Sequence, residues 1–299
     1  MRPSGRPRLT IARVVIALAL TAGAVACDKP EPKSALSYTA DAKKAYDAAM
    51  EEFQAHNWLE AQTLLREVRR KYAYSKYAKL AELRLADSDF EQDKFAEAIR
   101  GYRQFVHDHR SDTAEVSYAR SRIAEGQYRQ ISDSFLLPTA DERDQGVILD
   151  SFKELKGYLH DYPDSEESAH IRDLLGDVTA RLVRHELYVA RFYLARDNYE
   201  AAVLRIQYAL RNFASGPQFQ EPKKRVPGRA GLKLRGPRVE GADSGLEAEA
   251  LLLLGETYLK MHKWQDARGA FNAIVRDYPR SPLIVQAENY LAFMKERGV

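Results

Sequence analysis

Cys27 is the residue of this chain whose position indicates a definite chemical modification. It is the only cysteine among 299 residues, so no internal disulfide can form. It directly follows Ala24-Val25-Ala26, where the lipobox of a bacterial lipoprotein places its cysteine, although leucine is usual at the position of Ala24. The sequence therefore predicts lipidation of Cys27, with palmitate as an expected acyl chain.

Residues 1–26 have the composition of a secretory signal peptide. Four arginines precede an apolar run of 13 residues from Val14 to Ala26, which is shorter than the roughly twenty residues that a membrane-spanning helix needs. Removing this segment changes the formal net charge from +3 to −1, because four arginines leave with it and no acid does. The mature chain then has no electrostatic reason to bind nucleic acid.

The other reactive side chains do not form a catalytic or metal-binding motif. His185-Glu186 begins like the zinc motif HExxH, but Val189 stands where the second histidine belongs. His107 and His109 are separated by one residue and cannot share a helix face. The sequence also lacks a nucleophile elbow and a glycine-rich phosphate loop. We expect no enzyme activity, no metal site and no cofactor.

A recurring phrase organises the rest of the chain. An aromatic residue is followed three positions later by a small residue, and about a dozen residues later by a second aromatic or histidine and a helix stop. Four clear copies and a weaker one, at residues 151–165, follow this pattern. The aromatic and small residues are Trp58/Ala61, Phe95/Ala98, Tyr199/Ala202 and Trp264/Ala267, with Ser151 as the small residue of the weaker copy. Such self-similarity is typical of a solenoid.

Each copy is expected to form two antiparallel helices, because apolar and small residues recur at helical spacing on both sides of a short turn such as that at Asn57. The small residue allows the two helices to approach closely, and the aromatic residue fills the space beside it. One pair cannot bury its own apolar face, so neighbouring pairs must stack. The predicted fold is all-α, a tetratricopeptide-repeat solenoid of about five helix pairs.

The expected organisation is a lipid-anchored tether at 27–36, repeats one to four at 37–215, and a fifth repeat with a C-terminal helix at 246–299. One insertion, at 133–146, is expected between the helices of the third pair. Another, at 216–245, has four prolines, six glycines and seven basic residues against three acidic ones, a composition that cannot build a core. Two roles stay open for this loop: contact with anionic lipid or an acidic partner, and a solvated insertion without a role.

Several strings resemble the BamD family, tetratricopeptide lipoproteins of the outer-membrane β-barrel assembly (BAM) machinery. They include RKYAYSKYAKLAELRLADSDF at the junction of the first two repeats and HELYVARFYLARDNYEAAVLRIQYAL in the fourth. The resemblance covers about residues 37–215. The fifth pair matches as a repeat only, and the basic insertion departs from the family.

The resemblance implies a scaffold that is lipid-anchored at the periplasmic face of the outer membrane. Asp28 resembles an inner-membrane retention signal of enteric bacteria, so inner-membrane retention stays open. Members of the family bind the POTRA region of the barrel assembly protein through their C-terminal repeats, and other assembly lipoproteins are further expected partners. They receive the C-terminal segments of unfolded barrel precursors on their N-terminal repeats.

The resemblance also suggests site residues. Arg205 matches a family arginine that pairs with a carboxylate of the assembly protein, and Tyr199 lies in the same string. Candidates for precursor binding are Tyr74, Tyr77, Tyr46, Arg84, Phe53 and Phe90. Among these we favour Tyr74 and Tyr77, which lie at a repeat junction. For each residue the alternative is a structural role, in the core or in a surface salt bridge worth well under about 1 kcal/mol.

Two other functions share the same tether and solenoid. One is a pilotin-type lipoprotein that escorts a secretin. The other is a scaffold for cell-wall or division machinery, which is disfavoured because no heptad run precedes the repeats.

Overall fold

The structure is a computed structural model that describes residues 35–111, 113–131, 144–213 and 246–299. All regular secondary structure in these ranges is α-helical, which confirms the predicted all-α class. The signal peptide, Cys27 and the basic insertion lie outside the described residues. The helices are α2 (Ala35–Gln54), α3 (Trp58–Lys71), α4 (Lys76–Glu91), α5 (Phe95–Asp108), α6 (Thr113–Arg129), α7 (Gly146–Asp161), α8 (Ser168–Leu194), α9 (Tyr199–Asn212), α10 (Glu247–Lys260), α11 (Trp264–Asp277) and α12 (Ile284–Glu296).

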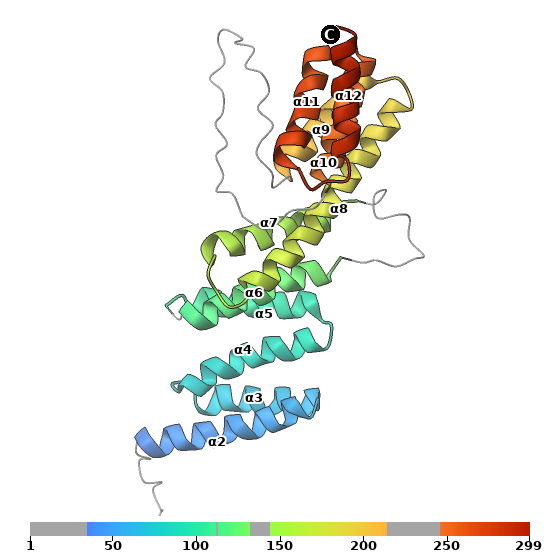
Figure 1. The fold of residues 1–299 in the computed structure, drawn as a ribbon. Helices are drawn as coiled ribbons and strands as arrows, with labels where there is room; N and C mark the ends of the chain where they lie inside the picture. Colours follow the sequence, from blue (N-terminus) through green and yellow to red (C-terminus); the bar gives the residue numbers. More distant parts are fainter. Residues whose placement is uncertain (1–34, 112, 132–143, 214–245) are drawn as a thin grey trace, which may run out of the picture.

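The helices form five successive antiparallel pairs, from α2 with α3 to α10 with α11, and α12 packs on the last pair. Helices α2 to α7 lie in a stack in chain order, and α9 to α12 form a bundle at the other end (Figure 1). The insertion predicted at 133–146 falls between α6 and α7, the helices of the third pair, and most of it lies outside the described residues. The tetratricopeptide solenoid expected from the repeats is therefore confirmed.

Four of the pairs turn with the same backbone geometry. The residue two positions before the aromatic at the start of the second helix has a φ of +58° or +59°. These residues are His56, Asp93, Asp197 and His262. This left-handed conformation is uncommon outside glycine, and aspartate and histidine are among the residue types that adopt it most readily. A shared turn gives each pair a similar geometry, so the pairs can stack in a regular way.

The small residue of each second helix is fully buried, as the repeat pattern predicts. The five residues are Ala61, Ala98, Ser151, Ala202 and Ala267. The aromatic residue three positions earlier is only half-buried in the four clear copies. It covers the edge of the helix contact. In the first pair, for example, the ring of Trp58 lies edge-on to Phe53 with their centroids 5.2 Å apart.

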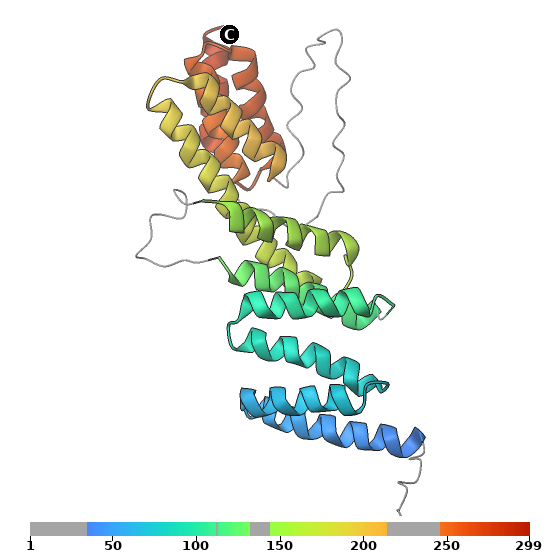
Figure 2. The same cartoon turned by 180° about the vertical axis from the view of Figure 1, so that it is seen from behind.

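Helix α8 joins the two ends of the molecule. It is 27 residues long, about twice the length of most of the others. Its first part packs on α7, and its last part packs on α9 and α10, so one continuous apolar core extends from Ala124 on α6 to Met294 on α12. Seen from behind, α8 again runs out of the lower stack into the upper bundle (Figure 2). The two ends are therefore connected by packed side chains.

The described helices do not include one that is both long enough and apolar enough to cross a membrane.

The contact between Gly255 and Phe271 gives a test of the close packing within a pair. A Cβ atom at Gly255 would lie 2.4 Å from the ring of Phe271, which is fully buried and stacked on Tyr290 at 4.8 Å. The ring has no space to move into, so Gly255→Ala should lower the free energy of unfolding by about 1–3 kcal/mol. Urea unfolding followed by circular dichroism measures this change.

Gly269→Ala is the matched control, because it lies in the partner helix α11 and its added Cβ meets nothing within 4 Å. Alanine is the better helix former, so this variant should be as stable as the parent or slightly more stable. Equal effects of the two substitutions would contradict the packing described for the fifth pair.

Candidate functional site

Asp87 lies at the centre of a polar cluster between the first helices of three successive pairs. The carboxylate is only 2% exposed. Its Oδ1 accepts a hydrogen bond from the Tyr102 hydroxyl at 2.5 Å and another from the Tyr118 hydroxyl at 3.0 Å. Its Oδ2 accepts one from the Arg84 guanidinium. Three donors on one buried carboxylate fix the relative positions of α4, α5 and α6.

Aromatic side chains extend this cluster towards the first pair. The rings of Tyr46 on α2 and Tyr77 on α4 lie 5.6 Å apart, and Tyr46 hydrogen-bonds Arg84. The Arg84 guanidinium lies 5.7 Å from the centre of the Tyr118 ring. We call these five residues the first-helix cluster: Tyr46, Tyr77, Arg84, Asp87 and Tyr118. Three predicted candidates, Tyr46, Tyr77 and Arg84, are therefore brought together.

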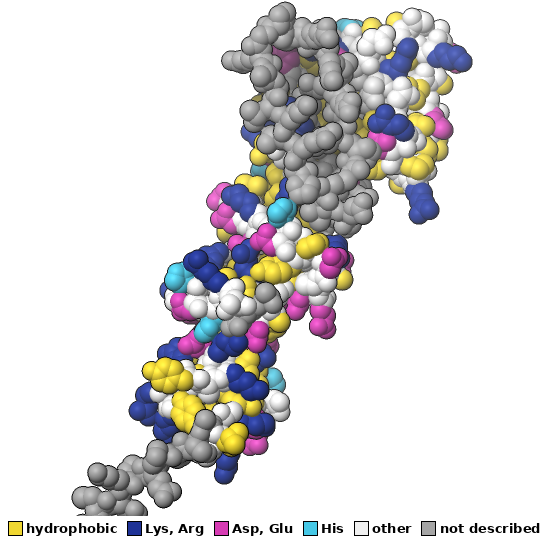
Figure 3. Space-filling model, turned by 90° about the vertical axis from the view of Figure 1, so that its left-hand side faces the viewer, with side chains coloured by type: hydrophobic (Ala, Val, Ile, Leu, Met, Phe, Trp, Pro, Cys, Tyr) yellow, Lys and Arg dark blue, Asp and Glu magenta, His cyan; other side chains and the backbone are white. Residues whose placement is uncertain are grey.

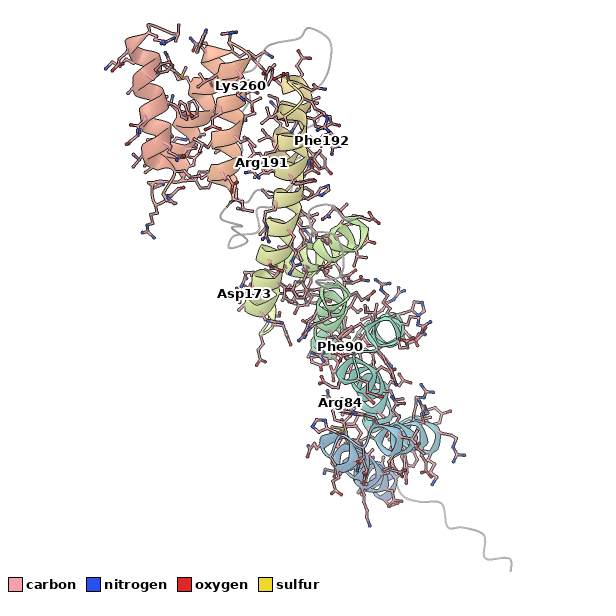
Figure 4. All side chains as sticks on the ribbon, turned by 90° about the vertical axis from the view of Figure 1, so that its right-hand side faces the viewer. Arg84, Phe90, Asp173, Arg191, Phe192 and Lys260 are labelled. Carbon is pink, nitrogen blue, oxygen red and sulfur yellow. The ribbon has the colours of Figure 1, made fainter. Side chains whose placement is uncertain are left out.

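The cluster is partly open to solvent. The Arg84 side chain is 31% exposed and lies in the lower stack of helices (Figure 4). Burial lowers the pKa of Arg84, but the charge of Asp87 and the hydrogen bond with Tyr46 outweigh this, so the pKa is raised and the residue stays cationic. An exposed cation between aromatic rings can bind a carboxylate and the apolar side chain beside it.

Burial and the nearby charge of Asp87 both raise the pKa values of the two tyrosines that donate to it. The pKa of Tyr118 is raised to about 12, and that of Tyr102 is raised further. Both phenols therefore keep their protons at neutral pH and act as hydrogen-bond donors to Asp87.

The remaining candidates at this end of the molecule do not join the cluster. Phe53 is half-buried against Trp58, whereas Phe90 is buried in the core beneath the Arg122 guanidinium at 3.6 Å. Tyr74 lies in the turn between α3 and α4 and is 99% exposed. It lines a separate pocket of about 320 Å³. The structure thus separates Tyr74 from Tyr77, the two residues favoured from the sequence.

Arg205 lies on a second surface, on α9. Its side chain is 45% exposed and forms an ion pair with Glu186 of α8, which is only 8% exposed, at 3.3 Å. Leu204 and Tyr208, on the same helix, are large hydrophobic side chains that remain exposed. We call Leu204, Arg205 and Tyr208 the α9 strip. The buried carboxylate orients the arginine, and much of the guanidinium still faces solvent.

Tyr199 has a different environment from the α9 strip. It is half-buried at the start of α9, where its hydroxyl donates to Asp197 at 2.7 Å. The ammonium of Lys260 on α10 lies 5.9 Å from its ring centre. Its contacts therefore belong to the turn and to the junction with the fifth pair.

Several residues of these surfaces were not predicted from the sequence. Asp87 and its donors Tyr102 and Tyr118 were missed, although a charged residue between the apolar positions Leu83 and Phe90 of one helix could have indicated a buried polar centre. The exposed Phe192 on α8 was also missed. Figure 4 shows Phe192 pointing away from the upper bundle, whereas Arg191, which pairs with Glu249, points towards it.

Within the described ranges, no group of three or more histidine, cysteine, aspartate or glutamate side chains could hold a metal ion. The chemistry that these two surfaces offer is recognition, through cations, phenols and exposed apolar side chains.

A family model described as YfiO, outer membrane lipoprotein, matches residues 39–224, and a tetratricopeptide repeat model matches residues 249–281. The first match covers more than half of the chain and includes both the first-helix cluster and the α9 strip. The second coincides with α10, α11 and the turn that follows.

Several curated proteins named outer membrane protein assembly factor BamD are similar to this chain. That of Caulobacter vibrioides is 26% identical over 204 residues, covering 68% of this chain but 63% of the relative, so the match spans less than two thirds of that protein. That of Neisseria meningitidis serogroup A is 21% identical over 255 residues and covers 82% of both chains. That of Vibrio cholerae is 25% identical over 166 residues, covering 54% of this chain and 68% of the relative.

Removing the central carboxylate tests the first-helix cluster. Asp87→Ala leaves the Arg84 guanidinium, the buried Tyr102 hydroxyl and the partly buried Tyr118 hydroxyl without their shared acceptor, so it should lower the free energy of unfolding by about 3 kcal/mol. The measurement is urea unfolding, with Asp150→Ala as control, because the Asp150 side chain is well exposed and pairs only with exposed Lys153. A loss no larger than that of the control would contradict the central position of Asp87.

The raised pKa of Tyr118 predicts how stability depends on pH. In the unfolded chain a tyrosine loses its proton near pH 10, whereas Tyr118 in the folded chain keeps it until about pH 12. The contribution to stability is therefore complete below pH 10 and is lost as the pH rises from 10 to 12. The unfolding midpoint should fall less steeply over this range in Tyr118→Phe than in the parent, and a slope unchanged by the substitution would contradict the raised pKa of Tyr118.

Proposed function

The chain belongs to the family of outer membrane lipoproteins whose model it matches over residues 39–224, and from this premise we propose that it is an outer membrane protein assembly factor. In this proposal it is a periplasmic scaffold, attached through lipid on Cys27 to the outer membrane, that helps β-barrel precursors reach their site of insertion. The scaffold needs no catalytic group, since recognition and positioning are its whole task. The family match is the observation that carries the proposal.

The α9 strip is proposed to bind the POTRA region of the barrel assembly protein. Arginine and tyrosine are among the residue types that contribute most of the binding energy at protein interfaces. Glu186 holds Arg205 in place before binding, so less side-chain entropy is lost when a partner carboxylate approaches the exposed part of the guanidinium. Other assembly lipoproteins are further proposed partners.

The first-helix cluster is proposed to receive the C-terminal segments of unfolded barrel precursors. Arg84 offers a partly exposed cation for a terminal carboxylate, and Tyr46 and Tyr77 offer rings for an aromatic side chain. The buried Asp87 carboxylate accepts a hydrogen bond from Arg84 and fixes the direction of its guanidinium. A stack of helices gives an extended segment a long surface to follow.

An escort for a secretin, or a scaffold for cell-wall machinery, is the second candidate function, because either would use the same tether and solenoid. The two candidates differ in the protein that binds the α9 strip. Recovery of the bound partner therefore distinguishes them.

Charge reversal at Arg205 tests the proposed function. The tagged lipidated protein is isolated from detergent-solubilised envelopes, and the proteins bound to it are identified by mass spectrometry. We expect a POTRA-containing barrel protein to be recovered with the parent and to fall at least about tenfold with Arg205→Glu, because the partner carboxylate then meets a like charge.

Arg100→Glu is the matched control, since the Arg100 side chain is 74% exposed and lies on α5, away from the α9 strip. It should leave recovery unchanged, and circular dichroism should show all three proteins folded. Recovery of a secretin or of cell-wall enzymes in place of the barrel protein would contradict the proposed function.

A further inference from the structure

Basic side chains gather along one edge of the first two pairs. They come from three neighbouring segments: the end of α3, the start of α4 and the residues just after α5. We call them the basic edge: Arg69, Arg70, Lys71, Lys76, Lys79 and Arg110. Three of them line one pocket together with Tyr74 and His109. Figure 3 shows this side of the molecule, where Lys and Arg side chains surround exposed hydrophobic ones on the lower helices.

The positive charge of the basic edge is only partly neutralised within the described residues. Lys71 pairs with Glu67, and Lys79 pairs with Glu115 at 3.6 Å. The other four cations, namely Arg69, Arg70, Lys76 and Arg110, form no ion pair with another described side chain. The acid that lines the pocket, Glu82, is engaged by His109 at 2.8 Å. The edge therefore presents net positive charge to an external anion.

Tyr74 projects from the middle of these cations. At 99% exposure it contributes nothing to the core, although its ring is large and apolar. Tyrosine is enriched where proteins meet the headgroup region of a membrane, because its ring and its hydroxyl suit the two sides of that interface. An exposed ring among cations, four of which form no ion pair with another described side chain, is the composition expected of a surface that contacts lipid headgroups.

The first described helix, α2, which follows the predicted lipid anchor in the chain, begins beside this edge. Near the start of α2, the Tyr38 hydroxyl lies 3.5 Å from the carbonyl oxygen of Lys71, and its ring lies 5.4 Å from that of Tyr72. Cys27 precedes Ala35 by eight residues, and eight extended residues reach at most about 29 Å. A lipid on Cys27 would therefore keep Ala35, at the start of α2, within about that distance of the membrane surface, with the basic edge close to it.

We propose that the basic edge docks on the anionic phospholipid headgroups of the membrane that holds the lipid anchor. This inference goes beyond the proposed scaffold function, since it assigns a second, electrostatic contact with the membrane. Each cation near an anionic surface contributes about fivefold to the affinity. Together with the anchor, the contact would fix which side of the first two pairs faces the membrane.

Vesicle binding tests this proposal. The probe protein is the mature chain with Cys27→Ser, so that binding does not depend on lipidation. Its co-sedimentation with vesicles of phosphatidylglycerol and phosphatidylethanolamine is compared with that on neutral phosphatidylcholine vesicles. We expect binding to the anionic vesicles only, weakened by salt, and reduced at least about tenfold in the double variant Arg69→Glu/Lys76→Glu.

Two control variants assign the binding to the edge. Lys153→Glu/Lys156→Glu reverses two exposed charges on α7 and should change binding by less than about twofold. Lys223→Glu/Lys224→Glu reverses two charges of the basic insertion and should retain most of the binding. The Arg205→Glu variant should bind vesicles like the parent, so a failure of the proposed function would not affect this result.

Three outcomes would overturn the proposal. One is equal binding to anionic and neutral vesicles. Another is loss of binding with the insertion variant but not with Arg69→Glu/Lys76→Glu, which would assign the lipid contact to the insertion. The third is a basic-edge variant that binds vesicles normally but loses a barrel-precursor peptide, which would make the edge a protein-binding surface. Circular dichroism confirms in each case that the variant is folded.

Discussion

The close approach of two helices at one small, buried residue is the contact on which the rest of this structure depends. Ala61, Ala98, Ala202 and Ala267 leave no room for a larger side chain between the helices of their pairs. Because these four pairs close in the same way, each presents a similar apolar face to its neighbour, and the pairs can stack. Without this contact the surfaces described above would have no fixed positions relative to one another.

Stacking converts a local repeat into the two separate surfaces that we propose for recognition. Near the N-terminus, Asp87 holds Arg84 on the side of the stack formed by the first helices of the pairs. Farther along the chain, Glu186 holds Arg205 on α9. In both places an almost fully buried carboxylate orients a partly exposed arginine, and helix α8 connects the two regions through a continuous core. A scaffold that holds two partners at once needs this combination of fixed positions and exposed charge.

The fold could be predicted from the sequence because its determinants are local: the aromatic and small residues lie three positions apart, and the helix stops recur with them. The candidate site could be predicted only in part. Tyr102 and Tyr118 donate to Asp87 from 15 and 31 residues away, a separation that helical periodicity does not encode. Tyr74 and Tyr77 looked equivalent because both lie at a junction. One residue is in the turn and the other is in the first turn of α4, and this small difference separates a fully exposed ring from one that packs on Tyr46.

The most direct test of the central claim, two surfaces with different partners on one scaffold, is site-specific photo-crosslinking in living cells. A photoreactive phenylalanine analogue replaces Tyr77 of the first-helix cluster in one strain and Leu204 of the α9 strip in another, with exposed Lys153 as the control position. We expect unfolded barrel precursors to be captured at position 77, a POTRA-containing barrel protein at position 204, and neither at position 153. Capture of the same partner at positions 77 and 204, or equal capture at position 153, would contradict the proposal of two surfaces with different partners.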